Sequence, residues 1–484
     1  MPRFSRYPVT VWQSGPTEPG QASPRPPECC AEIELTVTAC HPSNPWTTSE
    51  RMIPDRLAIL CVSPLPPSPP RFGAQARMHG LLTHLARHHD ITAISLIDDG
   101  FDAEECRRAM REYCRKVVLI PNPKGRRGAA KRVLQLLSLA SSRSFERLLH
   151  SVAALQPALD RVLLRERFDV VDLEFPYLAH SRLRQSPPGT SPPPVVLDAH
   201  EIAHDLARQM ARRNASLGRR IYGELNWRKL RSEERAALRV TDGVYACSAA
   251  DEARILADVP SARTAVIPNA ADVEYYQPRP SDPPSDGRTI LFFGLLSTAP
   301  NVDGVRFFIR EIWPRIAARR PDARCKIIGA RPHRSVLELA APRVEVVGFV
   351  DDLRPYLASA AALVVSLRLG GGTRLKIVEG MAMGKPIVST ALGAEGIEAT
   401  PERDILIADD PTSFAASVIR LLDDPALRAR LGQSARQLAV QRYSWSAAAS
   451  RLEGFFGQII ASRVSSASTR SSHCPAPASA RGAS

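Results

Sequence analysis

The chain has 484 residues, a formal net charge of +14 and a hydrophobic share of 44%. Domains average roughly 150 residues, so this length excludes one ordinary domain and predicts two or three. Its nine cysteines include no C-x-x-C pair, which excludes a disulfide scaffold and is typical of a reducing compartment. The positive charge comes from arginines spread along amphipathic segments, with no zinc knuckle, RNP-type strand or basic zipper, so we expect no nucleic acid partner.

The chain shows no targeting segment that we recognise. Its first residues lack the continuous apolar stretch of a signal peptide, and no segment reaches the roughly 18 apolar residues that a transmembrane helix needs. We therefore expect a cytoplasmic protein, at most peripheral on the inner face of the cell membrane. Residues 1–54 are rich in Pro, Ser, Thr and Glu, and residues 465–484 in Ser and Ala, so we expect a disordered extension and a disordered tail.

Short apolar segments alternate with helical patterns from residue 56 onward, which is typical of a doubly wound parallel sheet. In the first half, strands are predicted at 56–63, 91–96, 117–120, 170–173, 195–198, 243–247 and 265–269. Helical regions are predicted at 74–88, 129–164, 205–240 and 251–258. Residues 275–287 then have the Pro- and Ser-rich composition of a linker.

A second alternating series follows the linker. It comprises strands at 289–294, 325–329, 344–347, 361–367 and 387–390, and a helix at 302–319 that we expect Asn301 to cap. The pattern predicts an α/β fold with two doubly wound Rossmann-like domains facing a central cleft. Their expected bounds are residues 55–274 and 289–440, joined by a linker at 275–288.

The most informative segment is the run L-G-G-G-T-R-L-K-I-V-E-G-M-A-M-G-K-P-I-V-S-T at residues 369–390. It follows an apolar strand, and open α/β sheets bind ligands just beyond the carboxyl ends of their strands. The glycines permit a close backbone approach, and a helix pattern with Arg374, Lys376 and Glu379 opens behind them. Glycines alone could be a flexible turn, but this order of residues favours a ligand with a diphosphate at one end and hydroxyls at the other.

With further segments, this run resembles a GT-B glycosyltransferase of the GT4 type, the glycosyltransferase group 1 family, over residues 55 to 462. The further segments are the loop at Gly73, D-A-H-E at 198–201, V-I-P-N-A-A-D at 266–272, F-F-G-L-L-S-T-A-P-N-V-D-G at 292–304 and R-Y-S-W-S at 442–446. In this fold the last of them opens a helix, expected at 441–464, that crosses back to the first domain.

The resemblance implies an activity. A hexosyltransferase-type enzyme would move a sugar from a nucleotide-diphosphate sugar to a glycan or lipid-linked acceptor, with retained configuration, in bacterial cell-surface polysaccharide synthesis. Breaking the anomeric bond leaves negative charge on the departing phosphate, which fixed donors stabilise. We expect Arg374, Lys376 and the backbone amides of Gly371, Gly372 and Thr373 to do this, and Glu379 to accept hydrogen bonds from the ribose hydroxyls.

Other candidates come from placement within the resemblance. His200 would face the cleft and contact the donor sugar or the acceptor, although a lone histidine is often structural. Asp198 and Glu201 are weaker candidates for an acceptor base or for helix caps. The predicted catalytic residues are thus His200, Arg374 and Lys376, and the predicted donor-binding residues are Gly73, Gly294, Gly371, Gly372, Thr373 and Glu379.

The chain departs from the family pattern at two places. The family commonly has two glutamates eight positions apart; the second is Glu379 and the first position is Gly371. Many relatives also have an arginine just after the first glycine of the second domain, where this chain has Leu295, and a lysine a turn later, which is absent before Asn301. Arg374 and Lys376 are the nearest candidates for those missing contacts.

We expect no metal and no cofactor, because no D-x-D pair follows a strand and GT-B enzymes generally use helix N-termini and basic side chains. Two alternatives stay open. A sugar-nucleotide epimerase of similar fold would need no acceptor, and a non-catalytic GT-B-like partner protein, which the missing glutamate makes conceivable, would show no turnover.

Basic helical segments suggest an anionic membrane surface as a further partner. The apolar segment 133–137 and two further sets of residues carry this pattern: Lys124, Arg126, Arg127, Lys131, Arg132, Arg143 and Arg147, then Arg208, Arg212, Arg213, Arg219 and Arg220. Arginine and leucine on opposite helix faces suit anionic lipid headgroups. A charged face on a packed helix is the alternative.

Overall fold

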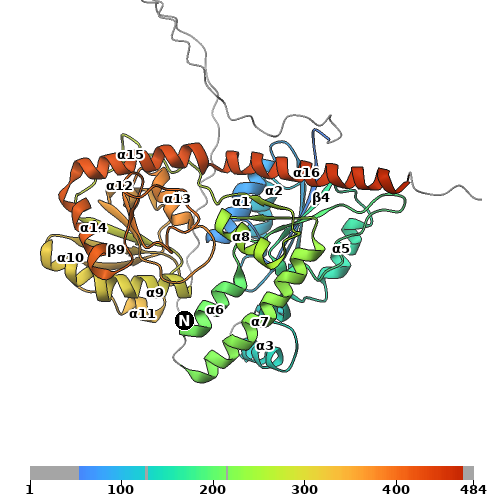
Figure 1. Ribbon diagram of the computed structural model, residues 1–484, viewed down its shortest axis with the longest axis horizontal. Helices are drawn as coiled ribbons and strands as arrows, with labels where there is room; N and C mark the ends of the chain where they lie inside the picture. The colour runs from blue at the N-terminus through green and yellow to red at the C-terminus, as the bar shows by residue number, and fades with distance from the viewer. Residues whose placement is uncertain (1–53, 126–128, 214–215, 472–484) are drawn as a thin grey trace, which may run out of the picture. The chain divides into compact units, whose positions relative to one another are not determined.

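The computed structural model describes residues 54–125, 129–213 and 216–471, which form two parallel sheets flanked by helices (Figure 1). Most of the expected disordered extension (1–53), the end of the expected tail (472–484) and the basic residues Arg126 and Arg127 lie outside the described residues.

The first sheet has seven parallel strands in the order β3-β2-β1-β4-β5-β6-β7. Their bounds are β1 Ala58–Ser63, β2 Asp90–Ile97, β3 Lys116–Pro121, β4 Val170–Glu174, β5 Val195–Asp198, β6 Gly243–Ala246 and β7 Thr264–Val266. The five strands β2, β1, β4, β5 and β6 in the middle of the sheet are buried at every residue or at all but one, as in a sheet covered on both faces. The strand order reverses between β1 and β4, and a doubly wound sheet binds its ligand at that point.

The second sheet repeats this order with six parallel strands, β10-β9-β8-β11-β12-β13. The strands are β8 Thr289–Phe293, β9 Arg324–Ile328, β10 Val344–Gly348, β11 Ala362–Val365, β12 Ile387–Ser389 and β13 Leu406–Ile407. Only the two-residue β13 was not predicted, because so short a strand has no periodicity. Two Rossmann-like sheets confirm the predicted fold class.

Helices connect the strands on both faces. In the first half they are α1 Gly73–Leu85, α2 Ala103–Arg111, α3 Ala129–Leu139, α4 Phe145–His150, α5 Leu155–Leu163, α6 Ala203–Arg213, α7 Leu217–Val240 and α8 Ala249–Asp258. In the second half they are α9 Ala299–Phe307, α10 Trp313–Arg319, α11 Arg334–Leu337, α12 Arg354–Ser359, α13 Leu375–Ala382, α14 Pro411–Asp423, α15 Pro425–Arg442 and α16 Trp445–Ser471.

Three helix predictions need correction. The region 129–164 is three helices, because Ser144 starts a new helix at α4 by accepting a hydrogen bond from the Arg147 amide (3.1 Å). The region 205–240 is two helices, α6 and α7. The helix after β8 starts at Thr298, so Asn301 lies inside it rather than at its cap, and a π-helical turn at Phe308–Ile312 separates α9 from α10.

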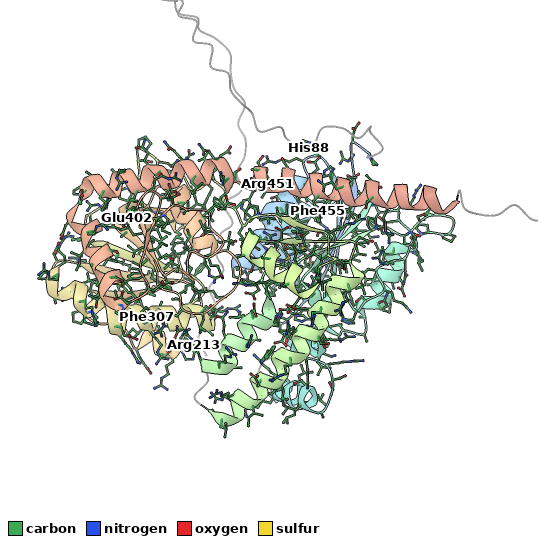
Figure 2. All side chains as sticks on the ribbon, viewed as in Figure 1. His88, Arg213, Phe307, Glu402, Arg451 and Phe455 are labelled. Atoms are coloured by element: carbon green, nitrogen blue, oxygen red, sulfur yellow. The ribbon has the colours of Figure 1, made fainter. Side chains whose placement is uncertain are left out.

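The last helix packs on the first sheet. Its residues Trp445, Leu452 and Phe456 belong to the same hydrophobic core as β1, α1 and β6. A β-carbon on Gly243 would lie 2.8 Å from the ring of Phe455, which is labelled in Figure 2, so the glycine makes room for this helix. Helix α16 continues to Ser471, past the predicted end at residue 464 and into the segment that we expected to be a disordered tail.

None of the helices in the described part of the chain is both long enough and apolar enough to cross a bilayer.

Candidate active site

A cavity of about 840 Å³ lies at the carboxyl ends of the two sheets, between residues of the first and second halves of the chain. Its walls include residues that follow the ends of β4, β5, β8 and β11. Of these strands, β4, β8 and β11 lie at the points where the strand order of the two sheets reverses. The cavity is lined by all nine predicted site residues: Gly73, His200, Gly294, Gly371, Gly372, Thr373, Arg374, Lys376 and Glu379. Residues far apart in sequence therefore share one site.

Lys376 projects from the first turn of α13 toward the loop that follows β8. Its Nζ donates a hydrogen bond to Oδ1 of Asn301 (2.7 Å) and lies 4.6 Å from the ring centre of Phe292. A β-carbon on Gly294 would lie 2.7 Å from that Nζ, so a glycine is needed beside the lysine. Lys376 thus brings a cation to the loop in which the expected arginine and lysine are missing.

Lys376 and Glu379 sit one helical turn apart and share a half-buried environment. Burial lowers the pKa of Lys376 to about 7; Arg374 lowers it further, while Glu379 opposes the shift. Burial also raises the pKa of Glu379 to about 7, against the charge of Lys376 and a hydrogen bond from Tyr276. The two groups therefore titrate as a pair near neutral pH, and an anionic ligand would keep the lysine charged.

The pattern predicted Arg374 within the helix, but it occupies the N-cap of α13, one residue before the helix begins. Its Nη1 donates to the carbonyls of Gly371 and Gly372. Its Nε and Nη2, and the hydroxyl of Thr373, are buried without a hydrogen-bond partner among the described residues. Buried polar groups of this kind are costly unless a ligand satisfies them.

The glycine loop is held from the first half of the chain. The side-chain amide of Gln209, on α6, donates to the carbonyl of Gly370 (3.2 Å) and accepts from its amide (3.1 Å). Nδ2 of Asn269 donates to the carbonyl of Thr373 (3.0 Å). Sequence reasoning missed both amides, because a contact between residues over a hundred positions apart leaves no local signal.

Helix α6 has a further contact with the second half. Nη1 of Arg213, which is labelled in Figure 2, lies 3.6 Å from Oδ2 of Asp303, on α9. Arg213, predicted as a lipid-binding residue, therefore also serves an ion pair.

His200 lies two residues beyond the end of β5 and is buried. Its Nε2 lies 2.6 Å from Oε2 of Glu174, the last residue of β4. Its ring stacks on Phe175, with ring centres 3.8 Å apart and planes at 4°. Sequence reasoning missed Glu174, although an acidic residue directly after the predicted strand at 170–173 was a readable signal.

Asp198 and Glu201 do not cap a helix, so that part of the prediction was wrong. The first amides of α6 donate instead to Glu234, at 3.0 Å from Ala203 and 3.1 Å from His204. Oδ2 of Asp198 accepts from Nε of Arg77 (2.6 Å) in a buried ion pair. Glu201 faces the glycine loop, where a β-carbon on Gly371 would lie 3.6 Å from its Cβ, so a carboxylate stands next to the position of the missing glutamate.

One group of described side chains, Glu174, Asp198 and His200, has ligand atoms within 4.8 Å of one another, as in metal sites. These atoms already have partners, because the guanidinium of Arg77 binds Asp198 and Glu174 binds His200. A cation there would have to share Asp198 with an arginine, so the donor set fits a hydrogen-bonded network better than a metal site.

Gly73 is the first residue of α1 and lines the cavity. A β-carbon there would lie 3.5 Å from Cδ1 of Leu375, which is an ordinary contact. Gly73 therefore lines the cavity, as predicted, but the space around it would also accommodate a β-carbon.

Comparison with known proteins bears on both halves. Residues 71–275 match the family model "Glycosyltransferase Family 4", and residues 287–424 match "Glycosyl transferases group 1". A GDP-mannose-dependent monoacylated alpha-(1-6)-phosphatidylinositol monomannoside mannosyltransferase of Corynebacterium glutamicum is 26% identical over 208 residues, covering 38% of this chain and 54% of that protein. The chain thus spans about half the length of the curated relatives it matches.

Solved structures match over more of the chain. The sucrose-phosphate synthase of Thermosynechococcus elongatus has a TM-score of 0.65 at 18% identity, covering 84% of this chain and all of that one (100%). Anabaena HepE in complex with UDP and glucose has a TM-score of 0.53 at 17% identity, covering 85% of this chain and 100% of that one. With both halves matched and the two-domain fold shared, the chain belongs to the GT-B glycosyltransferases of the GT4 type, the glycosyltransferase group 1 family.

Proposed function

We propose that this protein transfers a sugar from a nucleotide-diphosphate sugar to a glycan or lipid-linked acceptor. The observation that carries the proposal is the pairing of Lys376 and Glu379 on one face of α13, inside a cavity that the glycine loop also lines. The amine suits the diphosphate, and the carboxylate suits the ribose hydroxyls one helical turn away. Anabaena HepE, with the same fold, was solved with UDP and glucose, which supports a donor of this class.

The proposed reaction needs charge stabilisation at the departing phosphate. Cleaving the anomeric bond moves negative charge onto the diphosphate, and Lys376 and Arg374 both line the cavity that would hold it. The acceptor oxygen attacks the face from which the diphosphate leaves, and its proton passes to the departing phosphate, so the configuration is retained. Glu201, beside Gly371, is the carboxylate that we assign to the sugar hydroxyls.

We also propose that the donor binds without a divalent ion. Arg374 and Lys376 are among the cationic side chains that line the cavity, and they can neutralise a diphosphate directly. The carboxylates within metal-ligand distance of one another are already engaged by Arg77 and His200.

A thermal-shift panel of nucleotide sugars tests the proposal. One donor is expected to raise the melting temperature of the native protein by several degrees, equally in EDTA, since ligand at about 100 times its Kd stabilises by ~2.7 kcal/mol. Glu379→Ala is expected to abolish the shift, because the ribose hydroxyls lose their acceptor. Glu345→Ala is the matched control, since Glu345 lies on β10 and is well exposed.

Product analysis with the selected donor decides between enzyme classes. Sugar on an added acceptor supports transfer, whereas an epimerised nucleotide sugar formed without acceptor contradicts it. A thermal shift with no turnover under any acceptor indicates a non-catalytic partner protein. No shift with any nucleotide sugar contradicts the site itself.

We also propose that the protein binds an anionic membrane surface, where it would reach a lipid-linked acceptor. Leu217 (72% exposed), Ile221 and Leu225 follow one another at four-residue intervals on α7, and Arg220 and Arg228 share their face. Helix α3, which contacts α7 through Ser138 and Tyr222, exposes four more apolar side chains: Val133, Leu136, Leu137 and Leu139. Exposed leucines among arginines suit an anionic bilayer, and the mannosyltransferase of Corynebacterium glutamicum is named for a lipid-linked acceptor.

Flotation with vesicles tests that surface. Leu217→Gln/Ile221→Gln/Leu225→Gln is expected to reduce the bound fraction on anionic phosphatidylglycerol vesicles about tenfold, because apolar insertion and headgroup attraction add together. Leu337→Gln/Val440→Gln is the matched control, since both residues are also exposed, on the second half of the chain. Binding that is unchanged by the triple variant, or that does not depend on anionic lipid, contradicts the surface.

A further inference from the structure

The backbone is strained where two neighbouring strands end at the cavity. Phe175 follows β4 directly with φ of 67°, and His200 follows β5 by two residues with φ of 50°. Both are bulky residues in the left-handed region, which costs about 1 to 3 kcal/mol each and occurs mainly at functional sites. The strain brings the two rings into their parallel stack at 3.8 Å.

The stacked pair leaves one ring nitrogen of His200 for a ligand. Nε2 lies 2.6 Å from Oε2 of Glu174. Nδ1 has no hydrogen-bond partner among the described residues, and His200 lines the cavity. Whether Nδ1 donates a hydrogen bond to a substrate or accepts one from it therefore depends on the protonation of the contact between Nε2 and Glu174.

Charge balance decides how many protons the Glu174–His200 pair holds. Arg77 neutralises Asp198 in a buried ion pair with a 2.6 Å contact, so Glu174 and His200 are best accommodated as a neutral pair. A neutral pair is either a carboxyl with an imidazole or a carboxylate with an imidazolium. Both forms keep a hydrogen on Nδ1, and they differ only in the position of one proton between Oε2 and Nε2.

We propose that Glu174 is a positioning residue for His200: it fixes the ring and supplies the proton that makes Nδ1–H a hydrogen-bond donor to a substrate oxygen. As negative charge develops on that oxygen, the proton moves from Oε2 of Glu174 to Nε2 of His200. The carboxyl becomes a carboxylate, the ring becomes an imidazolium, and the net charge of the pair is unchanged. This assignment rests on the proposed function, since the substrate oxygen belongs to the donor sugar or to the acceptor.

The surroundings support the neutral pair. Burial raises the pKa of Glu174 well above its ordinary value, and Asp198 raises it further. Burial lowers the pKa of His200 to about 4. The other charged or titratable groups around the pair are Asp172, Tyr245 and Cys61 on strands of the sheet, Cys247 directly after β6, Glu201 after β5, and Arg77 from α1.

A double-mutant cycle with the isosteric Glu174→Gln tests the proposal. With the donor selected above at saturation, Glu174→Gln is expected to lower kcat about 100-fold, the lower end of the range for lost proton assistance, and to change KM for the donor less than threefold. In the His200→Ala background the same substitution is expected to change kcat less than twofold, because Glu174 acts through the ring. Equal losses in both backgrounds overturn the proposal and indicate a structural role.

The pH dependence of kcat provides a second readout. As pH rises and the native pair loses its proton, Nδ1 becomes an acceptor and kcat falls. The amide introduced by Glu174→Gln cannot lose a proton and donates N–H to Nε2 at every pH. The ratio of native to variant kcat is therefore expected to fall as pH rises from 6 to 9.5, and a constant ratio contradicts the proton assignment.

A measurement without substrate separates this inference from the proposed function. In ¹⁵N-histidine-labelled protein at pH 7, the resonance that disappears in His200→Ala is expected to show a protonated Nδ1 and a hydrogen-bonded Nε2. A neutral ring protonated at Nε2 alone overturns the assignment, whether or not any sugar transfer is detected.

Discussion

Replacing Lys376 with methionine is expected to lower kcat about 10²- to 10³-fold, the range observed when one fixed donor to a developing oxyanion is removed. The physical reason is that Lys376 is held by Asn301 at 2.7 Å, in the cavity that also contains the glycine loop. Its charge meets the departing phosphate in a site partly withdrawn from water, where it acts more strongly than at the surface. Steady-state kinetics at saturating donor measures the effect.

Lys385→Met is the matched control. Burial also lowers the pKa of Lys385, to about 8. Its Nζ donates to the carbonyls of Ala358 (2.6 Å) and Ala360 (3.3 Å), however, and it does not line the cavity. This variant is expected to lose some thermal stability and to keep kcat within threefold. If the two substitutions reduce kcat alike, Lys376 has no special role at the phosphate.

The pH dependence of donor affinity gives Lys376 a second signature. The free amine has a pKa of about 7, and a bound diphosphate raises it. Affinity due to this group is therefore fully present below pH 7 and falls as pH rises, by up to tenfold per unit until the pKa of the complex is reached. Calorimetric Kd values between pH 6 and 9 are expected to show this slope in the native protein and to lack it in Lys376→Met.

The sequence predicted the site to the extent that the site is local. The strand at 361–367, the glycines, the lysine and the glutamate occur in one continuous run, and the chemistry of diphosphate binding requires those residue types in that order. The doubly wound sheets followed from the alternation of apolar strands and helices, which both observed sheets confirm. Within one run, neighbours in sequence stay neighbours in space.

What the sequence did not predict are contacts between segments that lie far apart along the chain. Glu174 and Asp198 are direct partners in the parallel register of β4 and β5, but that register cannot be deduced from a single sequence. Gln209 contacts Gly370 only because α6 crosses to the other half of the chain. Asn301 looked like a helix cap, yet it serves as the acceptor for Lys376. Each of these roles depends on packing between distant segments, which local propensity does not encode.

Replacing Gly372 with alanine is expected to reduce kcat/KM about 100-fold, since a displacement near 1 Å at a reacting site costs about that much. Gly372 has φ of +67°, and an alanine β-carbon would lie 2.9 Å from the carbonyl oxygen of His200. That oxygen is backbone and accepts a hydrogen bond from Sγ of Cys247 (2.9 Å), so the glycine loop has to move instead. The movement shifts Arg374 and Lys376 away from His200 and breaks the geometry that the first half of the chain imposes on the loop.

Gly189→Ala separates this crowding from backbone strain. Gly189 has φ of +79°, and a β-carbon there would meet nothing within 4 Å, so alanine adds only the left-handed penalty of about 1 kcal/mol. Both variants are expected to lose a similar few degrees of melting temperature, while only Gly372→Ala loses activity. Full activity in Gly372→Ala would contradict this prediction. It would mean that turnover does not require the close contact between the glycine loop and the backbone of His200.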